Sequence, residues 1–316
     1  MFPNLSLKQF NHSLNHTTPM SISLRPTLAT SIVVSTAIAA LNVHASVGYT
    51  TPGSTYSQNF DSLPNTPENT SLGTSPVGWT DDNAAPGAGN FSIVGWYLYH
   101  PLSLLGAEGG FNGNQRMRIG AGSANTGGFM SFGASGSTER ALGDVGSNVL
   151  AGPNAPTNSI WIGLRLSNTT GVTLNSFTVT YDGEQWRDGG ATTPVAQTMN
   201  FMWSTTATAI SDPNSSFTPE ASLNFTSPVF ANTGSGAAVN GNTVGRVAGI
   251  TATVAGFNWA PGTDLWLRWD DINNAGNDHG LAIDNFTFSA SAVPEPSVCA
   301  LAGLAAVGGL ICRRRK

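Results

Sequence analysis

Short runs of β-branched and aromatic residues recur along this chain of 316 residues, and Gly, Pro or Asn interrupts each run after a few positions. This pattern favours strands joined by turns, because a long helix needs an uninterrupted helical periodicity. Ten strands are predicted, at Thr55–Phe60, Phe91–Tyr99, Gln115–Ile119, Gly128–Phe132, Ser159–Leu166, Thr173–Tyr181, Ala196–Ser204, Ala237–Val254, Asp264–Trp269 and Leu281–Ser289. Strands in this order, without helices between them, predict an all-β fold: an antiparallel β-sandwich of the jelly-roll type.

The alternation of side chains within these runs indicates which faces are covered. In Thr173–Tyr181, Phe177, Val179 and Tyr181 share one face, whereas the other face carries mainly hydroxyl groups. In Asp264–Trp269 both faces carry large apolar residues, so both faces are expected to be covered. Residues 61–90 and 205–236 lack such runs and are predicted to be long surface loops.

The region between the two termini is acidic and lacks cysteine. Residues 46–292 contain seven Arg, no Lys and 17 Asp and Glu, and both cysteines, Cys299 and Cys312, lie beyond it. The excess of acids argues against nucleic acid or an anionic membrane surface as a partner. Without a thiol, this region has no disulfide, no cysteine nucleophile and no zinc–thiolate site.

The last 24 residues combine three features in a fixed order. A proline-rich motif comes first, and its prolines keep the backbone extended and accessible to an enzyme. The uncharged run Val298–Cys312 follows and is shorter than the ~20 residues of a comfortable bilayer span. A basic cluster ends the chain and is expected to stay on the cytoplasmic side. The motif is Val293, Pro294, Glu295, Pro296 and Ser297, and the cluster is Arg313, Arg314, Arg315 and Lys316.

This arrangement resembles the PEP-CTERM sorting signal, in which a Val-Pro-Glu-Pro-Ser type motif precedes a hydrophobic segment and an Arg-rich end. The resemblance covers residues 293–316. It implies export, a transient stay in the inner membrane through a short transmembrane helix, and recognition and cleavage near the motif by an exosortase-type membrane protease. Members of that family are typically surface or extracellular-matrix proteins of Gram-negative bacteria that make exopolysaccharide.

The opposite end of the chain is predicted to be a signal peptide. Arg25 precedes the apolar stretch Leu28–Val43, and Val43 and Ala45 occupy the two positions that a signal peptidase reads before Ser46. Met20 is an alternative start that leaves a signal peptide of ordinary length. The expected organisation is a signal peptide at 1–45, one β-sandwich domain at 46–292 and the sorting signal at 293–316.

Residues 181–188 follow a predicted strand and gather charged side chains around Trp186. One interpretation is a ligand-binding loop, in which Trp186 stacks on a sugar while Glu184 and Arg187 bond its hydroxyl groups. The other is a β-turn, because Asp182-Gly183 is a common turn pair. We favour the turn and keep the ligand loop as the alternative.

The densest polar segment is residues 268–280, which is predicted to join the last two strands. Carboxylate and amide oxygens at close spacing are the ligands that Ca²⁺ prefers, and the spacing here does not match an EF-hand. The alternative is a hairpin loop with Asx-turns. The candidate calcium ligands are Asp270, Asp271, Asn273 and Asp278.

The stretch Trp266–Phe288 and the early stretch Tyr56–Pro64 resemble the last and first strands of jelly-roll modules in exported PEP-CTERM proteins. Neither stretch carries an assigned activity. A sandwich-type glycoside hydrolase needs two facing carboxylates, and the nearest pair, Glu184 and Asp188, falls in the predicted turn. No nucleophile elbow or phosphate-binding loop is present.

The preferred hypothesis is therefore a non-enzymatic exported protein of the cell surface or extracellular matrix, with exopolysaccharide as a partner. A carbohydrate-binding module that uses exposed aromatics such as Trp186, Trp96 and Tyr97 is the alternative, and a glycan-degrading hydrolase ranks third.

Overall fold

The computed structural model describes residues 46–68, 77–83, 86, 89–100, 116–125, 127–147, 159–231 and 234–292. The predicted signal peptide and the sorting motif with its basic cluster lie outside these residues. The described part contains strands, turns and two short 3-10 helices, η1 (Asn214–Ser216) and η2 (Ala221–Leu223). In that part of the chain, no helix has the length and hydropathy to cross a membrane.

Seven strands form one sheet, the seven-stranded sheet. Its hydrogen-bonded order is β1-β9-β16-β11-β12, with β5 also paired to β9 and β13 also paired to β11. The strands are β1 (Val47–Tyr49), β5 (Trp96–Tyr99), β9 (Ser159–Asn168), β11 (Thr198–Ser204), β12 (Thr218–Pro219), β13 (Phe225–Thr226) and β16 (Asp264–Ile272).

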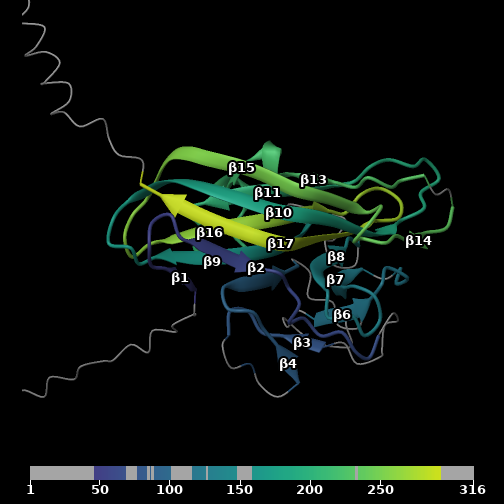
Figure 1. Cartoon of the computed structure of the whole chain (residues 1–316). Coiled ribbons are helices and arrows are strands. Elements are labelled where there is room, and N and C mark those ends of the chain that lie inside the picture. The colour runs from purple at the N-terminus through teal and green to yellow at the C-terminus, as the bar shows by residue number, and fades with distance from the viewer. Residues whose placement is uncertain are drawn as a thin grey trace, which may run out of the picture. The chain divides into compact units, whose positions relative to one another are not determined.

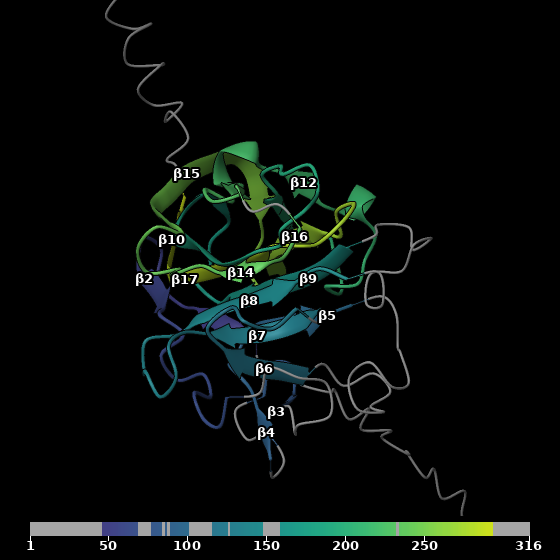
Figure 2. The same cartoon turned by 90° about the vertical axis from the view of Figure 1, so that its right-hand side faces the viewer.

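Ten strands form the other sheet, the ten-stranded sheet. Its order is β14-β10-β17-β8-β7-β6-β3-β4, with β15 paired to β10 and β2 paired to β17. Figure 2 shows β8, β7 and β6 side by side, with β3 and β4 beyond them. The strands are β2 (Thr55–Gln58), β3 (Val77–Trp79), β4 (Asn90–Phe91), β6 (Arg116–Gly120), β7 (Gly128–Phe132), β8 (Ala141–Val145), β10 (Leu174–Asp188), β14 (Ala237–Ala238), β15 (Arg246–Trp259) and β17 (Gly280–Ser291).

The main core lies between the two sheets, where β10 and β17 pack over β9 and β16 (Figure 1). Apolar residues at every second position of these strands point into it, as the alternation of a pleated strand requires. This burial confirms the predicted all-β sandwich. Most neighbouring strands are antiparallel, but β1–β9, β3–β4 and β6–β7 are parallel pairs that the sequence did not predict.

Strand β16 is covered on both faces, as its sequence predicted. Leu267 and Trp269 face the main core, whereas Trp266 belongs to a second apolar cluster on the other side of the sheet. The guanidinium of Arg268 lies in that second cluster, 3.7 Å from the ring centroid of Phe217. Its Nη1 donates to the carbonyl oxygens of Ile210 and Asp212 and so holds the 205–217 segment against the sheet.

Several predicted boundaries are wrong. The predicted strand Ala237–Val254 is two strands, because residues 241–245 turn between β14 and β15. The predicted strand Phe91–Tyr99 is also divided, with Gly95 at a φ of 81° just before β5. The predicted loops contain β3, η1, β12, η2 and β13, and β1 and β8 were not predicted at all.

The predicted turn and the alternative loop at residues 181–188 are both wrong, because β10 continues without interruption to Asp188. Gly183 allows the ring of Phe225 to pack closely against β10, because a Cβ at position 183 would lie 2.2 Å from Cδ2 of Phe225. Asp182 accepts hydrogen bonds from the backbone N–H of Gly249 and from the side chains of Arg246 and Asn285. Tertiary contacts therefore outweigh the local turn preference of Asp-Gly.

Candidate functional site

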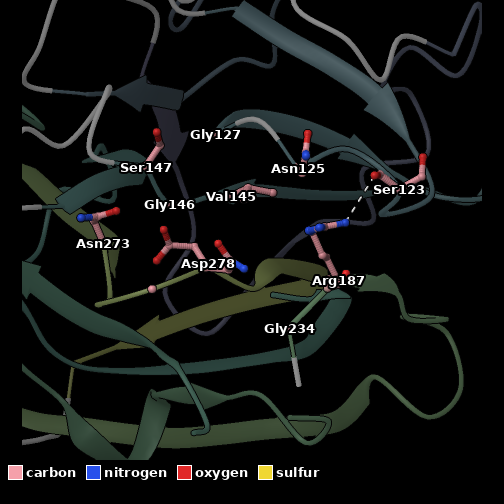
Figure 3. A pocket seen from close by; sticks show the side chains of 14 residues that line it. Ser123, Asn125, Gly127, Val145, Gly146, Ser147, Arg187, Gly234, Asn273 and Asp278 are labelled. Atoms are coloured by element: carbon pink, nitrogen blue, oxygen red, sulfur yellow. Dashed lines mark hydrogen bonds between the residues drawn. The ribbon is translucent and has the colours of Figure 1, made fainter. Parts of the chain in front are cut away.

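A polar pocket of about 600 Å³ opens at one end of the ten-stranded sheet. Figure 3 shows Arg187 and Asp278 along one wall, with Asn125 and Ser147 across from them. The walls come from the end of β10, the end of β8, the loop after β16, and the chain near residues 123–127 and 234–236. The pocket thus brings together Arg187 and Asp278, which the sequence assigned to two separate candidate sites.

Arg187 is the cation of the pocket and is 7% exposed. Its Nη1 atom donates to the carbonyl oxygens of Gly122 and Ser123, at 3.2 and 3.3 Å. Burial lowers the pKa of this guanidinium, and neighbouring Asp188 acts in the opposite direction. A Cβ at position 236 would lie 2.1 Å from Nη2 of Arg187, so glycine is required where this loop passes the guanidinium.

Asp278 is the carboxylate of the pocket. One of its oxygens accepts a hydrogen bond from the backbone N–H of Asn274 at 2.8 Å, which fixes the loop after β16. Burial raises the pKa of Asp278 to about 6. Above that pH the pocket presents one cation and one anion, together with the hydroxyl and amide groups of residues such as Ser147 and Asn125. Such a lining suits a polar ligand that both donates and accepts hydrogen bonds.

A pair of buried aspartates, Asp144 on β8 and Asp271 on β16, lies behind this pocket and bridges the two sheets. They are 1% and 2% exposed, and neither oxygen of Asp144 receives a hydrogen bond from a donor group. Each carboxyl group acts on the pKa of the other, and two carboxylates this deeply buried and this close disfavour each other's ionisation. Burial and the nearby carboxylates raise the pKa of Asp144 to about 7 and that of Asp271 well above its usual range.

Because the pKa values of this pair are raised, we expect the protein to be more stable at about pH 5 than at about pH 8. The measurement is made in EDTA, so that no metal ion contributes to the difference. An acid whose pKa is higher in the folded than in the unfolded state stabilises the fold while it is protonated. That contribution is complete below the unfolded pKa near ~4 and is lost as the pH rises through the folded pKa. One such group changes the free energy of unfolding by up to about 1.4 kcal/mol per pH unit.

Urea unfolding across this pH range measures the slope. Asp270 and Asp278 also act on the pair, so the informative variant is Asp144→Asn, which should flatten the dependence. Asp264→Asn is the control, because Asp264 lies at the opposite end of β16 from Asp271 and pairs with Arg165 at a partly exposed site. A wild-type stability that rises from acidic to neutral pH would contradict this reading of the pair.

The four predicted calcium ligands do not converge on one point. Asp270 and Asp271 are in β16, not in a loop, and successive side chains of a strand point to opposite faces. Asp271 meets Asp144, whereas Asp270 accepts a hydrogen bond from Asn214 at 3.1 Å on the other side. Asn273 and Asp278 line the pocket.

The residues of the predicted ligand-binding loop do not form one site either. Trp186 is 3% exposed and stacks on Phe132 at 6.1 Å between ring centroids, so it presents no open face to a sugar. Glu184 is 1% exposed and points to the same outer side of β10 as Trp186, away from the main core. Trp96 and Tyr97, predicted as exposed aromatics, are buried as well. Of the ligand-loop residues, only Arg187 reaches the pocket.

The sequence did not reveal the other parts of this site. Asp144 lies in the short run Ala141–Val145, in which Gly143 breaks the apolar pattern and so conceals a strand. The segments near 123–127 and 234–236 are polar and Gly-rich, which indicates a loop but no particular function. The strand order β14-β10-β17-β8-β7-β6 brings these distant segments to one end of the sheet.

No protein-family model and no curated protein matches the chain. One solved structure that it resembles is the K3 cleaved adhesin domain of Lys-gingipain from Porphyromonas gingivalis, at 14% identity and a TM-score of 0.30 over 62% of this chain and 92% of that one. Another is the CBM22-1 xylan-binding domain of Paenibacillus barcinonensis Xyn10C, at 7% identity and a TM-score of 0.26 over 53% and 82% of the two chains. At TM-scores this low, neither likeness assigns a family or a function.

Proposed function

We propose that this chain is an exported, non-enzymatic protein of the cell surface or extracellular matrix that binds a segment of polysaccharide in the polar pocket. The proposal of polysaccharide binding rests on the lining of the pocket. Arg187 and Asp278 lie on one wall, and hydroxyl and amide side chains surround them. A sugar unit offers hydroxyl groups that donate to a carboxylate and accept from a guanidinium, so both charges find a partner. The volume of about 600 Å³ has room for a short saccharide segment.

Export and processing by an exosortase-type protease are supported by the C-terminal residues, from Val293 to Lys316, and by the N-terminal signal-like segment. A protein released by that route meets the extracellular polysaccharide. The acidic balance of residues 46–292 suits a neutral or cation-bridged glycan better than a strongly anionic one.

Binding is favoured over hydrolysis because Asp278 is the one carboxylate among the fourteen residues that line the pocket. Hydrolysis of a glycosidic bond uses two carboxyl groups on either side of the bond. His279 and Asp188 form a pair, with 3.5 Å between Nε2 and Oδ1, but both are buried and neither lines the pocket.

The test is binding of the purified full-length protein, in mild detergent, to an array of neutral and acidic oligosaccharides, followed by calorimetry with the best ligand. Asp278→Asn and Arg187→Met are each expected to weaken binding by about tenfold or more, since a hydrogen bond to a charged group contributes ~1.5–3 kcal/mol. Asn125→Ala, which removes one amide from the opposite wall, should weaken binding less.

The matched controls are Asp264→Asn and Arg165→Met, which remove the same charges from an ion pair on the seven-stranded sheet. Both are expected to bind as the wild type does. An array without a binding glycan, or variants of the pocket that bind as well as these controls, would remove the pocket from the proposal. Release of reducing sugar from a bound glycan would instead favour the hydrolase.

A further inference from the structure

Three carboxylates from distant parts of the sequence meet on the outer side of the ten-stranded sheet. Glu139 precedes β8, Glu184 lies on β10 and Asp284 lies on β17. One oxygen from each lies within 4.8 Å of the others, and among the described residues no other group of three carboxylate, His or Cys ligands is as close. This triad is separate from the residues of the polar pocket and from the calcium ligands predicted from the sequence.

Two members of the triad are buried. Glu184 is 1% exposed and Asp284 is 3% exposed, whereas Glu139 is partly exposed and leaves the triad accessible from one side. The Oδ1 atom of Asp284 is fully buried and has no hydrogen-bond partner. A buried carboxylate oxygen without a donor is costly, so this atom points to a missing positive partner.

Among the residues that the structure describes, no cationic side chain forms an ion pair with the triad. Arg246, which acts electrostatically on Glu184 and Asp284, forms an ion pair with Asp182 at 2.5 Å. Arg140, next to Glu139, donates instead to the Ser131 hydroxyl and to the carbonyl oxygen of Ala134.

The other polar contacts of the triad are neutral donors. Trp186 Nε1 donates to Glu184 at 2.9 Å, the Asn242 side chain donates to Glu139, and the Asn285 side chain donates to Oδ2 of Asp284 at 3.0 Å, which leaves Oδ1 of Asp284 without a donor. Burial, with the neighbouring acids adding to it, raises the pKa of Glu184 to about 7 and that of Asp284 to about 8.

We propose that Glu139, Glu184 and Asp284 bind a divalent cation of the Ca²⁺ type, which ties β8, β10 and β17 together. Ligand oxygens on opposite sides of Ca²⁺ are about 4.6–5.2 Å apart, because each lies about 2.3–2.6 Å from the ion. The spacing within the triad therefore allows one ion to contact all three carboxylates. The open side, next to Glu139, leaves room for the water ligands that complete the coordination of this ion.

The position of Trp186 beside the triad allows ion binding to be measured directly by luminescence. Tb³⁺ occupies oxygen-rich Ca²⁺ sites, and its emission is sensitised by an excited indole close to the ion. Because the Trp186 ring donates to a carboxylate of the triad, Tb³⁺ added to the full-length protein should emit strongly on excitation of tryptophan, and Ca²⁺ should displace it. Trp186→Phe should lose most of the sensitised emission while Ca²⁺ binding measured by calorimetry remains.

The variants Glu184→Gln and Asp284→Asn keep the shape of each side chain and are each expected to weaken Ca²⁺ binding by more than about tenfold. Without metal they should unfold at the same or a higher temperature than the wild type, because repulsion within the triad is relieved. With saturating Ca²⁺ the wild type should gain stability by mass action and the variants should not.

Asp278→Asn and Asp264→Asn are the matched controls, since they remove carboxylates from the pocket and from the other sheet. Both should retain sensitised emission and the Ca²⁺ effect. Emission that survives Glu184→Gln and Asp284→Asn, or that is lost in Asp278→Asn instead, would overturn the assignment of the ion to the triad. A wild-type protein that neither binds Tb³⁺ nor responds to Ca²⁺ or Mg²⁺ would overturn it as well.

Discussion

Replacing Pro294, Glu295 and Pro296 together by alanine is expected to leave the full-length protein in the inner membrane. The expected reason is that alanine would permit helix in this segment, whereas proline disfavours helix and so favours access by the proposed membrane protease. On the proposed sorting route the effect is expected to be all or none, because the apolar run Val298–Cys312 and the basic end would hold an uncleaved chain in the inner membrane. Immunoblots of inner-membrane, surface and medium fractions measure it in the producing cell.

The control replaces Pro194 and Pro228 by alanine, because both prolines lie between strands of the sandwich and outside the motif. This variant should mature and leave the membrane as the wild type does. If the triple variant is processed to the same size and released at the same rate, the motif is not the sorting signal.

Replacing Trp269 by alanine is expected to cost about 3–5 kcal/mol of folding free energy. Trp269 lies on β16, is fully buried and contacts rings from both sheets, with centroids 5.2 Å away at Phe201, 5.7 Å at Tyr181 and 5.6 Å at Phe286. Its removal leaves a cavity at the point where the two sheets meet. Urea or thermal unfolding of the full-length protein measures the loss.

Trp269→Phe keeps an aromatic ring in the same place and should cost less than the alanine variant. Ile272→Ala, in the same strand but 39% exposed, should change stability by no more than about 0.5 kcal/mol. Equal losses for Trp269→Ala and Ile272→Ala would contradict the central place of Trp269 in the core.

Strands with a regular apolar pattern and clear ends could be predicted from the sequence. Gly128–Phe132 was predicted with both boundaries correct, and Asp264–Trp269 was predicted with both faces covered. In these segments the local preference of the residues and the demands of the core agree. Prediction failed where they disagree: Asp182-Gly183 favours a turn locally, but packing against Phe225 and pairing with β15 and β17 keep it in a strand.

The candidate sites were predictable only in part, because a sequence shows which polar residues are present but not which of them meet. Arg187 and Asp278 were both identified as candidate ligands, yet for different sites, and the structure brings them to one pocket. Glu139 and Asp284, which form the triad with Glu184, were not candidates at all. Each lies on or beside a different strand, and strand order sets their distance.

The sequence by itself determined the class of fold and the acidic and thiol-free character of residues 46–292, because these depend on local pattern and composition. The sorting signals at the two ends stay predictions. Only the tertiary structure decided which charges are buried and which meet. That difference has a physical cause: the pairing of β10 with β17 and of β17 with β8 connects positions up to about 140 residues apart, such as Leu142 and Ile283. No local propensity encodes such a contact, and the polar pocket and the carboxylate triad both depend on it.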